Sequence, residues 1–423
     1  MANETKLPSP DEVRAEIRAW LAANWKPTYG LVEWRNILVD GGWASPGWPT
    51  AWHGRDYTPP LVAIVDEEMR KAGAVGPARA GPRNLASATI LEHGNDAQKA
   101  RFLRRILTGE DSWCQLFSEP GNGSDLAGAI TRADFKDGKW IINGQKVWTT
   151  SAHHADWGLL VARTDWDAPK HQGLSYFLLN MRQPGVEVRP LRQMNGHASF
   201  NEVFFTDAMA EPEHLLGRPG EGWAAATTTL MHERRGFGGG GAGVGLASGP
   251  ERKGGIYEEE RIETAHAMEP YTWYPQRAGR VDLIIPRAKE SGAINDPVVR
   301  QEIAKALILA RTAEWTTRRS RTAQAQGQQP GPEGSIAKLT ASLIARQAAR
   351  THTMISGADA MLSGADGPQD GIIAEILIST PAVSIAGGTD EIQKNIIAER
   401  VLRMPKDNSV DPAKPFREIA GSR

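Results

Sequence analysis

The sequence predicts an α+β protein in which a β domain lies between two helical domains. Apolar residues recur at helical spacing through residues 1–112. From about residue 113 to residue 217 the apolar period becomes two, and turn residues become frequent. Helical patterns then return and continue along the rest of the chain. We therefore expect an N-terminal helical domain (1–112), a central β-barrel or sandwich domain (113–217), and a C-terminal helical domain (218–423) with an insertion at about 249–286.

Helix-start and helix-stop residues divide the N-terminal domain. Ser9-Pro10-Asp11-Glu12 has the form of a capping box with proline at the first helical position. Asn95 has the residue type of another N-cap, and glycines stand where helices should stop. Three further helices are expected after a loop rich in Trp, Gly and Pro, at about 61–73, 85–94 and 95–109.

The central domain carries strand and turn signals. Asp137-Gly138 and Asn143-Gly144 are each flanked by strand formers, and both dipeptides predict hairpin turns. Alternating or apolar runs predict short strands at 157–164, 174–180, 186–191 and 202–206.

The C-terminal domain shows helical patterns interrupted by a charged segment. Helices are expected at 222–237, 296–327, 334–363, 371–378 and 390–402. Gly238 to Gly241 lowers helix propensity, and we interpret this run as a kink or a close helix contact. The charged segment 249–286 contains the cluster Tyr271-Thr272-Trp273-Tyr274.

Composition narrows the classes of function. The charges nearly cancel, with 49 Lys+Arg against 50 Asp+Glu, so no basic field for nucleic acid or acidic membranes is present. The single cysteine, Cys114, excludes an internal disulfide and fits a reducing compartment. The polar N-terminus is unlike a signal peptide, and no long apolar run predicts a membrane span. These features predict a cytoplasmic protein.

The most specific signal lies at residues 116–156. Phe117-Ser118-Glu119-Pro120 leads into the glycine-bearing loop Gly121 to Asp125, whose backbone can approach a ligand closely. Trp148-Thr149-Thr150-Ser151 follows on a strand. This stretch resembles the signature of the acyl-CoA dehydrogenase family of flavoproteins, in which a TEPGAGSD-like loop and a KxWIT-like strand hold the flavin ring. The resemblance extends from about residue 7 to about residue 405.

The resemblance implies a fold, a reaction and a set of partners. It implies an α–β–α order that ends in a four-helix bundle. It also implies FAD-dependent α,β-dehydrogenation of an acyl-CoA thioester to the trans-2-enoyl-CoA. In that reaction a base removes the α-proton while a hydride passes from the β-carbon to flavin N5. A homotetramer or a heterotetramer with a homologous chain is expected, with an electron-transfer flavoprotein as electron acceptor.

The resemblance offers two places for the catalytic base. Many family members carry a Glu in a C-terminal YEGT-like motif, but Gly387 occupies that place here. Isovaleryl-CoA dehydrogenases instead carry it on an earlier helix in an LDLER-like motif, and this chain has Glu233 at the matching position. We therefore predict Glu233 as the base. The alternative interpretation of Glu233 is a surface salt bridge with a nearby arginine, and Glu391 is a second candidate for the base.

Further site residues follow from the same motifs. Gly387 keeps a backbone N–H that can polarise the thioester oxygen, together with a ribityl hydroxyl of the flavin. Ser124 matches the family's pantetheine contact, and Arg234 is expected to hold the pantetheine or a neighbouring carboxylate. The expected FAD contacts are Phe117, Ser118, Trp148, Thr149, Thr150, Gly388, Thr389 and Glu391.

The chain also departs from the family pattern. An Arg-x-Thr-Phe-Gly segment that reaches a neighbouring subunit's FAD is replaced by residues 286–292, where Arg287 is a possible substitute. A QIFGG-like segment is altered to residues 355–360. These losses favour an alternative in which the chain completes the FAD site of a heteromeric dehydrogenase. An acyl-CoA oxidase or a flavin monooxygenase on the same fold is a further alternative. His153-His154 with Asp156 is too poorly spaced to predict a metal site.

Overall fold

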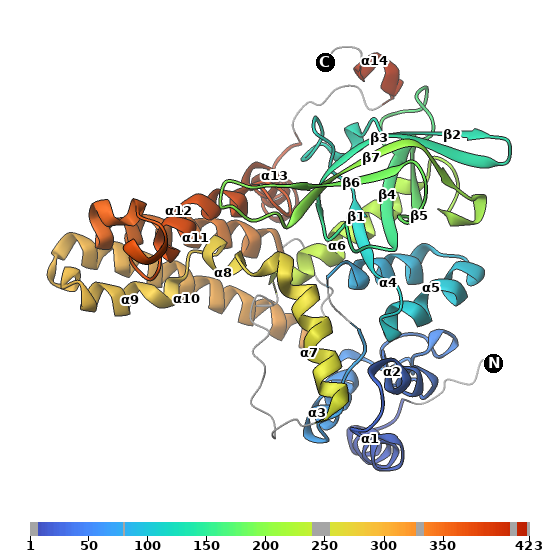
Figure 1. Cartoon of the computed structure of the whole chain (residues 1–423), viewed down its shortest axis with the longest axis horizontal. Coiled ribbons are helices and arrows are strands. Elements are labelled where there is room, and N and C mark those ends of the chain that lie inside the picture. Colours follow the sequence, from blue (N-terminus) through green and yellow to red (C-terminus); the bar gives the residue numbers. More distant parts are fainter. Residues whose placement is uncertain (1–6, 79–80, 239–253, 327–333, 407–412, 421–423) are drawn as a thin grey trace.

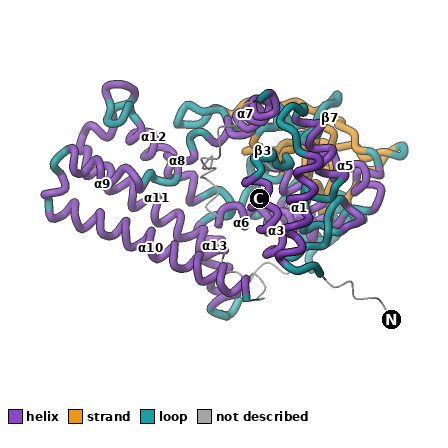
Figure 2. Tube along the Cα trace, turned by 90° about the horizontal axis from the view of Figure 1, so that it is seen from below, coloured by secondary structure: helices purple, strands orange, loops and turns teal. Residues whose placement is uncertain are grey.

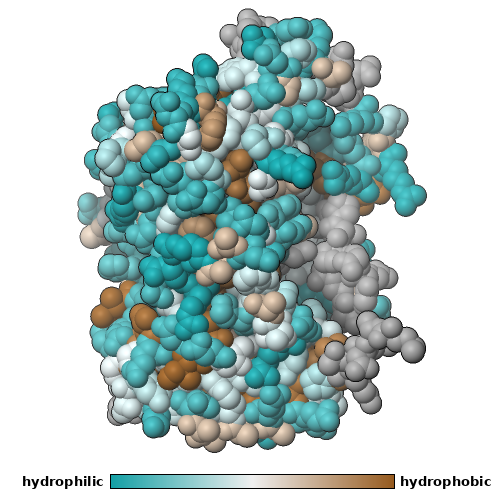
Figure 3. Space-filling view, turned by 90° about the vertical axis from the view of Figure 1, so that its right-hand side faces the viewer, coloured by the Kyte–Doolittle hydropathy of each residue, from teal (hydrophilic) through white to brown (hydrophobic). Residues whose placement is uncertain are grey.

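The computed structural model describes residues 7–78, 81–238, 254–326, 334–406 and 413–420 (Figure 1). A helical part, a β-sheet and a second helical part follow one another along the chain, so the predicted α+β order is confirmed. The long C-terminal helices extend away from the sheet as an arm, and Figures 1 and 2 both show them side by side. The face in Figure 3 is mostly hydrophilic, with hydrophobic side chains in small separate groups.

The N-terminal part begins with the predicted capping box. The Ser9 hydroxyl accepts from the Glu12 N–H, and the Glu12 side chain accepts from the Ser9 N–H. Asn95 caps the fifth helix in the same way, with Gln98 as its partner, and Gly109 ends that helix in the left-handed conformation. The second helix, α2, was not expected from the pattern. The helices are α1 (Pro10–Asn24), α2 (Leu31–Asp40), α3 (Pro59–Lys71), α4 (Pro82–His93) and α5 (Asp96–Thr108).

Eight strands form one connected sheet. Their path is β6-β7-β3-β2-β4-β5-β8, with β1 paired in parallel with β4. One face packs on α4, α5 and the first helix after the sheet, with Ile90, Phe102 and Leu178 among the buried side chains. The strands are β1 (Trp113–Leu116), β2 (Arg132–Lys136), β3 (Lys139–Thr150), β4 (Trp157–Arg163), β5 (Leu174–Asn180), β6 (Val186–Leu191), β7 (Phe200–Ala210) and β8 (Leu215–Leu216).

One of the two predicted hairpins is wrong. Asp137-Gly138 turns β2 into β3, and both residues have positive φ. Asn143-Gly144 instead lies inside β3, where the register with β7 shifts between Ile142 and Gly144. Gly144 has φ +148°, and an added Cβ would lie 2.8 Å from the Thr131 Cα. The glycine is therefore used for a bulge and a close backbone contact, since long-range pairing of β3 with β7 overrides the local turn preference.

The C-terminal part is helical, as expected, and includes three helices within or near the charged segment. The long helices α10 and α11 lie against each other. The predicted kink or helix contact at Gly238 to Gly241 lies, apart from Gly238, outside the described residues. The helices are α6 (Gly222–Gly238), α7 (Gly255–Met268), α8 (Tyr274–Arg277), α9 (Val281–Glu290), α10 (Pro297–Ala325), α11 (Gly334–Ser356), α12 (Ile372–Ser379), α13 (Asp390–Ile396) and α14 (Phe416–Ala420).

A buried carboxylate makes the stability of the N-terminal part depend on pH. Glu68 on α3 is 3% exposed and accepts from Arg18 Nε at 2.6 Å and from Lys71 Nζ at 3.0 Å. The Arg18 hydrogen bond is the main cause that lowers the Glu68 pKa to about 2. Because the folded pKa lies below the unfolded value of 4.5, the stabilisation is complete above pH 4.5 and is lost as pH falls towards 2.

Glu68→Gln is therefore expected to destabilise the protein at neutral pH by about 1 to 2 kcal/mol. The difference in free energy of unfolding between wild type and variant should shrink as pH falls from 5 to about 2. Urea unfolding at several pH values measures it. A difference that stays constant over this range would show that the Glu68 ion pairs do not stabilise the fold.

Candidate active site

A buried ion pair fixes the predicted flavin loop against β3. Lys146 Nζ lies 2.9 Å from Glu119 Oε1, and both side chains are almost completely buried. Lys146 also donates to the Phe117 carbonyl at 3.0 Å, and Glu119 accepts from the N–H groups of Ile130 and Thr131. Burial opposes the charge of Glu119, but Lys146 and these N–H groups outweigh it and lower the pKa of the carboxyl. The loop is thus held in one geometry by charge-assisted hydrogen bonds.

The strand beside this loop presents an aromatic ring to the outside. Trp148 is 56% exposed and has φ +61°, which is rare for a bulky residue. The register of β3 with β7 shifts between Lys146 and Thr149, so a bulge turns Trp148 out of the ladder. The Thr149 hydroxyl is buried and has no hydrogen-bond partner among the described residues. An exposed ring beside an unpartnered hydroxyl fits the contacts that a flavin ring needs.

The loop brings Ser118 beside this strand. The Val147 N–H donates to the Ser118 carbonyl at 2.9 Å, and Ser118 and Thr150 are both half-buried. Phe117 is different: its ring is 5% exposed and packs edge-on against Tyr176 in the core. A cofactor contact at Phe117 would therefore use its backbone. Ser124 is exposed at the end of the loop.

The predicted base lies next to the strand that leads into this loop. Glu233 on α6 is half-buried, and its Oε2 accepts from Gln115 Nε2 on β1 at 3.3 Å. Its carboxylate is therefore brought to β1, three residues before Ser118. Sequence reasoning missed Gln115, because nothing near it in sequence marks a partner 118 residues away. The predicted substrate contact of Arg234 lies outside the described side chains.

Gln115→Leu is expected to move the acidic limb of the pH–kcat/KM profile to higher pH. Removing a donor from an ionised carboxylate favours its protonated form. On the acidic limb, kcat/KM should fall by about fivefold, which corresponds to the energy of one modest hydrogen bond. Gln145→Leu is the matched control, since Gln145 donates to Glu202 on the neighbouring strand at 2.9 Å. If the acidic limb does not shift in Gln115→Leu, Gln115 does not interact with the catalytic base.

The second predicted centre is a pair of glycines before α13. Gly387 and Gly388 have φ +67° and +86°, a conformation that glycine adopts without strain. Gln393, fully buried, donates to the carbonyl oxygens of both glycines at 3.1 and 3.3 Å. Within the described residues the Gly387 N–H donates to no protein acceptor. A fixed turn with a free N–H is suited to bind a developing negative charge.

The remaining residues of this segment are placed less favourably for catalysis. The Thr389 hydroxyl accepts from the Ile392 N–H and caps α13. The Glu391 side chain is 76% exposed and lies 3.9 Å from Lys394, which places its carboxylate in solvent in this chain.

Arg287, the possible substitute for the missing arginine, is buried and donates to Ser356 at 2.7 Å. Its side chain is therefore packed within this chain and exposes little surface.

A cavity of about 580 Å³ opens at the start of α6. His171 and Trp223 lie on its wall with their rings 4.7 Å apart, and Lys170, next to His171, pairs with Asp125 at 2.6 Å. The cavity is thus close to the loop that carries Ser124. Its lining residues are Glu92, His93, His171, Gln172, Leu216, Gly217, Gly220, Glu221, Trp223, Ala224 and Ala225.

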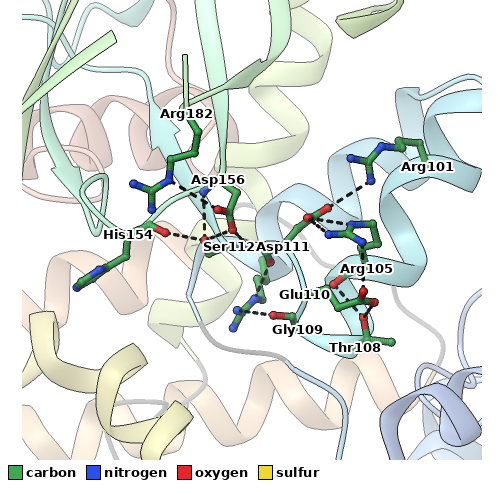
Figure 4. A network of polar contacts seen from close by, with 11 residues as sticks. Arg101, Arg105, Thr108, Gly109, Glu110, Asp111, Ser112, His154, Asp156 and Arg182 are labelled. Atoms are coloured by element: carbon green, nitrogen blue, oxygen red, sulfur yellow. Dashed lines mark hydrogen bonds and ion pairs between the residues drawn. The ribbon is translucent and has the colours of Figure 1, made fainter. Parts of the chain in front are cut away.

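The polar cluster around Asp156 joins the N-terminal helices to the sheet. Asp156 accepts from the Ser112 hydroxyl at 2.6 Å and lies 3.7 Å from Arg182, and the His154 carbonyl accepts from Ser112 (Figure 4). Asp111, which directly precedes Ser112, pairs with Arg105 at 2.9 Å.

Among the described residues, no three His, Cys, Asp or Glu side chains come together as metal ligands. Within the same residues, every helix is too short or too polar to cross a bilayer.

Comparison with known families gives three matches in chain order. The acyl-CoA dehydrogenase N-terminal domain matches residues 10–110, the middle domain matches residues 114–208, and the C-terminal domain matches residues 281–402. None of them covers residues 209–280. The matched ranges together span most of the chain and include the flavin loop, β3 and the two glycines.

Similar proteins carry the same family name. The chain is 31% identical to acyl-CoA dehydrogenase IpdE1 of Mycobacterium tuberculosis, over 94% of this chain and 98% of that protein. It is 37% identical to acyl-CoA dehydrogenase FadE34 of the same organism over 87% of this chain, and it spans 46% of the length of FadE34. Among solved structures, the Tcur3481-Tcur3483 steroid ACAD aligns with a TM-score of 0.64 at 23% identity, over 95% of this chain and 99% of that one. The ChsE4-ChsE5 complex from Mycobacterium tuberculosis aligns with a TM-score of 0.62 at 24% identity, over 96% of this chain and 100% of that one.

Proposed function

This chain belongs to the acyl-CoA dehydrogenase family of oxidoreductases, and from that premise we propose how its own residues divide the reaction. The proposed reaction converts an acyl-CoA thioester to the trans-2-enoyl-CoA with Glu233 as the base. The observation that carries this assignment is the place of Glu233. It is a half-buried carboxylate hydrogen-bonded to β1, beside the loop that matches the family's flavin contacts. The alternative position, 387, carries a glycine.

Glu233 and the Gly387 N–H have complementary roles. Glu233 takes the α-proton, and a hydrogen bond from Gly387 to the thioester oxygen stabilises the charge that develops as this proton leaves. One donor at such a position is typically worth about 3 kcal/mol in the transition state. Gln393 holds the turn so that the N–H does not have to reorganise. Each group acts on a different atom of the substrate.

The cofactor of the family fits the residues beside Glu233. We propose that FAD binds against Trp148, Thr149 and Thr150 on one side and against the loop at Ser118 on the other. When bound, FAD supplies the acceptor for the hydride from the β-carbon. The exposed Trp148 ring and the unpartnered Thr149 hydroxyl support this placement. We also propose an electron-transfer flavoprotein as the next electron acceptor.

The CoA arm is proposed to run along α6. Trp223 and Glu233 lie on the same helix, about 15 Å apart along its axis at ~1.5 Å per residue. This span is on the order of an extended pantetheine arm. The cavity at Trp223 and the nearby Ser124 then hold the part of CoA beyond the thioester.

A second candidate function follows from Arg287. Because this side chain is buried and donates to Ser356, we expect it to make no contact with a neighbouring subunit's FAD. We propose that another homologous chain supplies it in a heterotetramer. Native mass spectrometry with flavin quantitation tests this. One FAD per chain in a homotetramer would contradict it, whereas substoichiometric flavin restored by a homologous chain supports it.

The test of the proposed reaction is product identification. The purified full chain, incubated with FAD, an artificial electron acceptor and a panel of acyl-CoAs, is expected to yield a product two hydrogens lighter than its substrate. Mass spectrometry detects that loss directly. Hydrogen peroxide formed without an acceptor would indicate an oxidase, and a product heavier by one oxygen would indicate a monooxygenase. Either outcome would contradict the proposal.

A further inference from the structure

Residues 254–280, here called the bridging segment, lie in the stretch that no matched family domain covers. The helix α7 within it is fixed on the N-terminal domain. Ile256 is fully buried in that domain's core, and the Tyr257 hydroxyl donates to the Gly73 carbonyl at 2.9 Å. Glu259 accepts from the Leu31 N–H at 2.7 Å. Figure 1 shows α7 running from the C-terminal helices to the N-terminal ones. The start of the segment is thus packed against the N-terminal domain.

The end of the bridging segment is anchored in the other two domains. Trp273 is 1% exposed, and its Nε1 donates to the Ser199 hydroxyl at 3.1 Å, just before β7. Gln276 Nε2 donates to Glu375 on α12 at 3.4 Å. The residues between α7 and α9 are therefore held from three sides.

Two tyrosines of this segment form an aromatic pair. The rings of Tyr271 and Tyr274 lie 4.8 Å apart and are nearly perpendicular, at 88°. The buried Arg277 guanidinium lies 4.1 Å from the centre of the Tyr274 ring, and Trp273 lies 5.0 Å from the same ring. Tyr271 and Tyr274 stay half-buried, whereas Trp273 and Arg277 are buried. The two tyrosines therefore offer surface, and the other two side chains support them from behind.

The pair is connected to the predicted flavin strand by a series of ring contacts. Ring contacts run from Trp148 to Phe200 (5.8 Å), from Phe200 to Trp273 (6.3 Å), and on to Tyr274. Burial is the main cause that raises the pKa of Tyr274 and of Tyr271, and the negative charge of Glu233 adds to the rise in both. Both hydroxyls thus stay protonated and uncharged near the proposed base. Through these ring contacts the pair is joined to the strand that carries Trp148.

We propose that Tyr271 and Tyr274 form one wall of the acyl-binding site and make it selective for acyl groups that carry a ring over linear ones. This inference rests on the proposed function, since it assigns the acyl side of the same site. Perpendicular rings offer one face and one edge, and another ring gains from stacked or edge-to-face contact with them. A flexible linear chain gains burial alone and loses rotamer freedom when it is ordered. The uncharged wall also disfavours a charged acyl end.

The test compares selectivity across variants. The kcat/KM for 3-phenylpropionyl-CoA relative to octanoyl-CoA is measured in the wild type, in Tyr271→Ala with Tyr274→Ala, and in Tyr271→Phe with Tyr274→Phe. The alanine variant should lower this ratio by roughly tenfold, and the phenylalanine variant should keep it. Phe135→Ala is the control, because Phe135 is 55% exposed on β2, away from the site. Thermal melting confirms that each variant is folded.

The outcomes separate this inference from the proposed function. An unchanged kcat/KM ratio in a folded alanine variant, or an equal loss of kcat/KM for both substrates, would contradict the proposal that the two tyrosines select ring-bearing acyl groups. Calorimetric binding of the same two acyl-CoAs provides a readout that needs no turnover. If the wild type oxidises neither substrate, the proposed reaction fails, but the ratio of the two dissociation constants still decides whether the tyrosines select rings.

Discussion

Glu233→Gln is expected to lower the rate constant of anaerobic flavin reduction by about 10²- to 10⁴-fold, the usual contribution of a positioned base. Glutamine has nearly the same shape as glutamate but cannot take a proton. The half-buried Glu233 side chain and its contact with Gln115 leave room for the amide. Flavin content should therefore stay at the wild-type level, so that the loss belongs to the chemical step. Stopped-flow absorbance with a saturating acyl-CoA measures both quantities.

Glu391→Gln is the matched control for this variant. Glu391 is the other carboxylate near the family's usual base position, but its side chain is 76% exposed and pairs with Lys394. Its substitution should change the reduction rate by less than about twofold. A large loss in Glu391→Gln together with a normal rate in Glu233→Gln would transfer the role of base to Glu391.

Lys146→Met is expected to destabilise the protein by about 3 to 5 kcal/mol and to lower its flavin content. Lys146 is fully buried, so its removal leaves the Glu119 carboxylate buried without its cation. The loop from Phe117 to Ser124 then loses the side chain that holds its carbonyl to β3. Urea unfolding gives the free energy, and absorbance of purified protein gives the flavin content.

The same strand offers a control whose ion pair is exposed to solvent. Lys139 pairs with Glu211 at 2.8 Å, but the two side chains are 45% and 41% exposed. Lys139→Met should therefore leave both the free energy of unfolding and the flavin content close to the wild-type values. Equal costs for the two substitutions would show that the buried pair does not hold the loop.

The helices could be predicted from sequence wherever local residues determine them. Ser9 and Asn95 cap their helices through residues three positions later, and Gly109 ends α5 by its own conformation. These interactions are contained in a few consecutive residues. The flavin loop and Trp148 were identified through a family resemblance, since the bulge that exposes the tryptophan depends on the pairing of β3 with β7.

What the sequence did not predict depends on distant partners. The Gln115–Glu233 contact joins residues 118 positions apart. Asn143-Gly144 has the local chemistry of a turn, yet its strand continues because β7 pairs with it on both sides of the bulge. The bridging segment looked like a charged insertion, and its helix is fixed by groups of α2 and Gly73, far away in sequence. Such contacts have no local pattern to reveal them.

The central claim is that Glu233 removes the α-proton of an acyl-CoA. The most direct measurement follows deuterium in an acyl-CoA labelled with two deuteriums at the α-carbon, after anaerobic incubation with wild type or Glu233→Gln. With wild type, the enoyl-CoA product should keep one α-deuterium and lose the other to water. With Glu233→Gln, the substrate should keep both deuteriums and form no product on the same timescale. Equal loss of α-deuterium in the two proteins would contradict the assignment of the base.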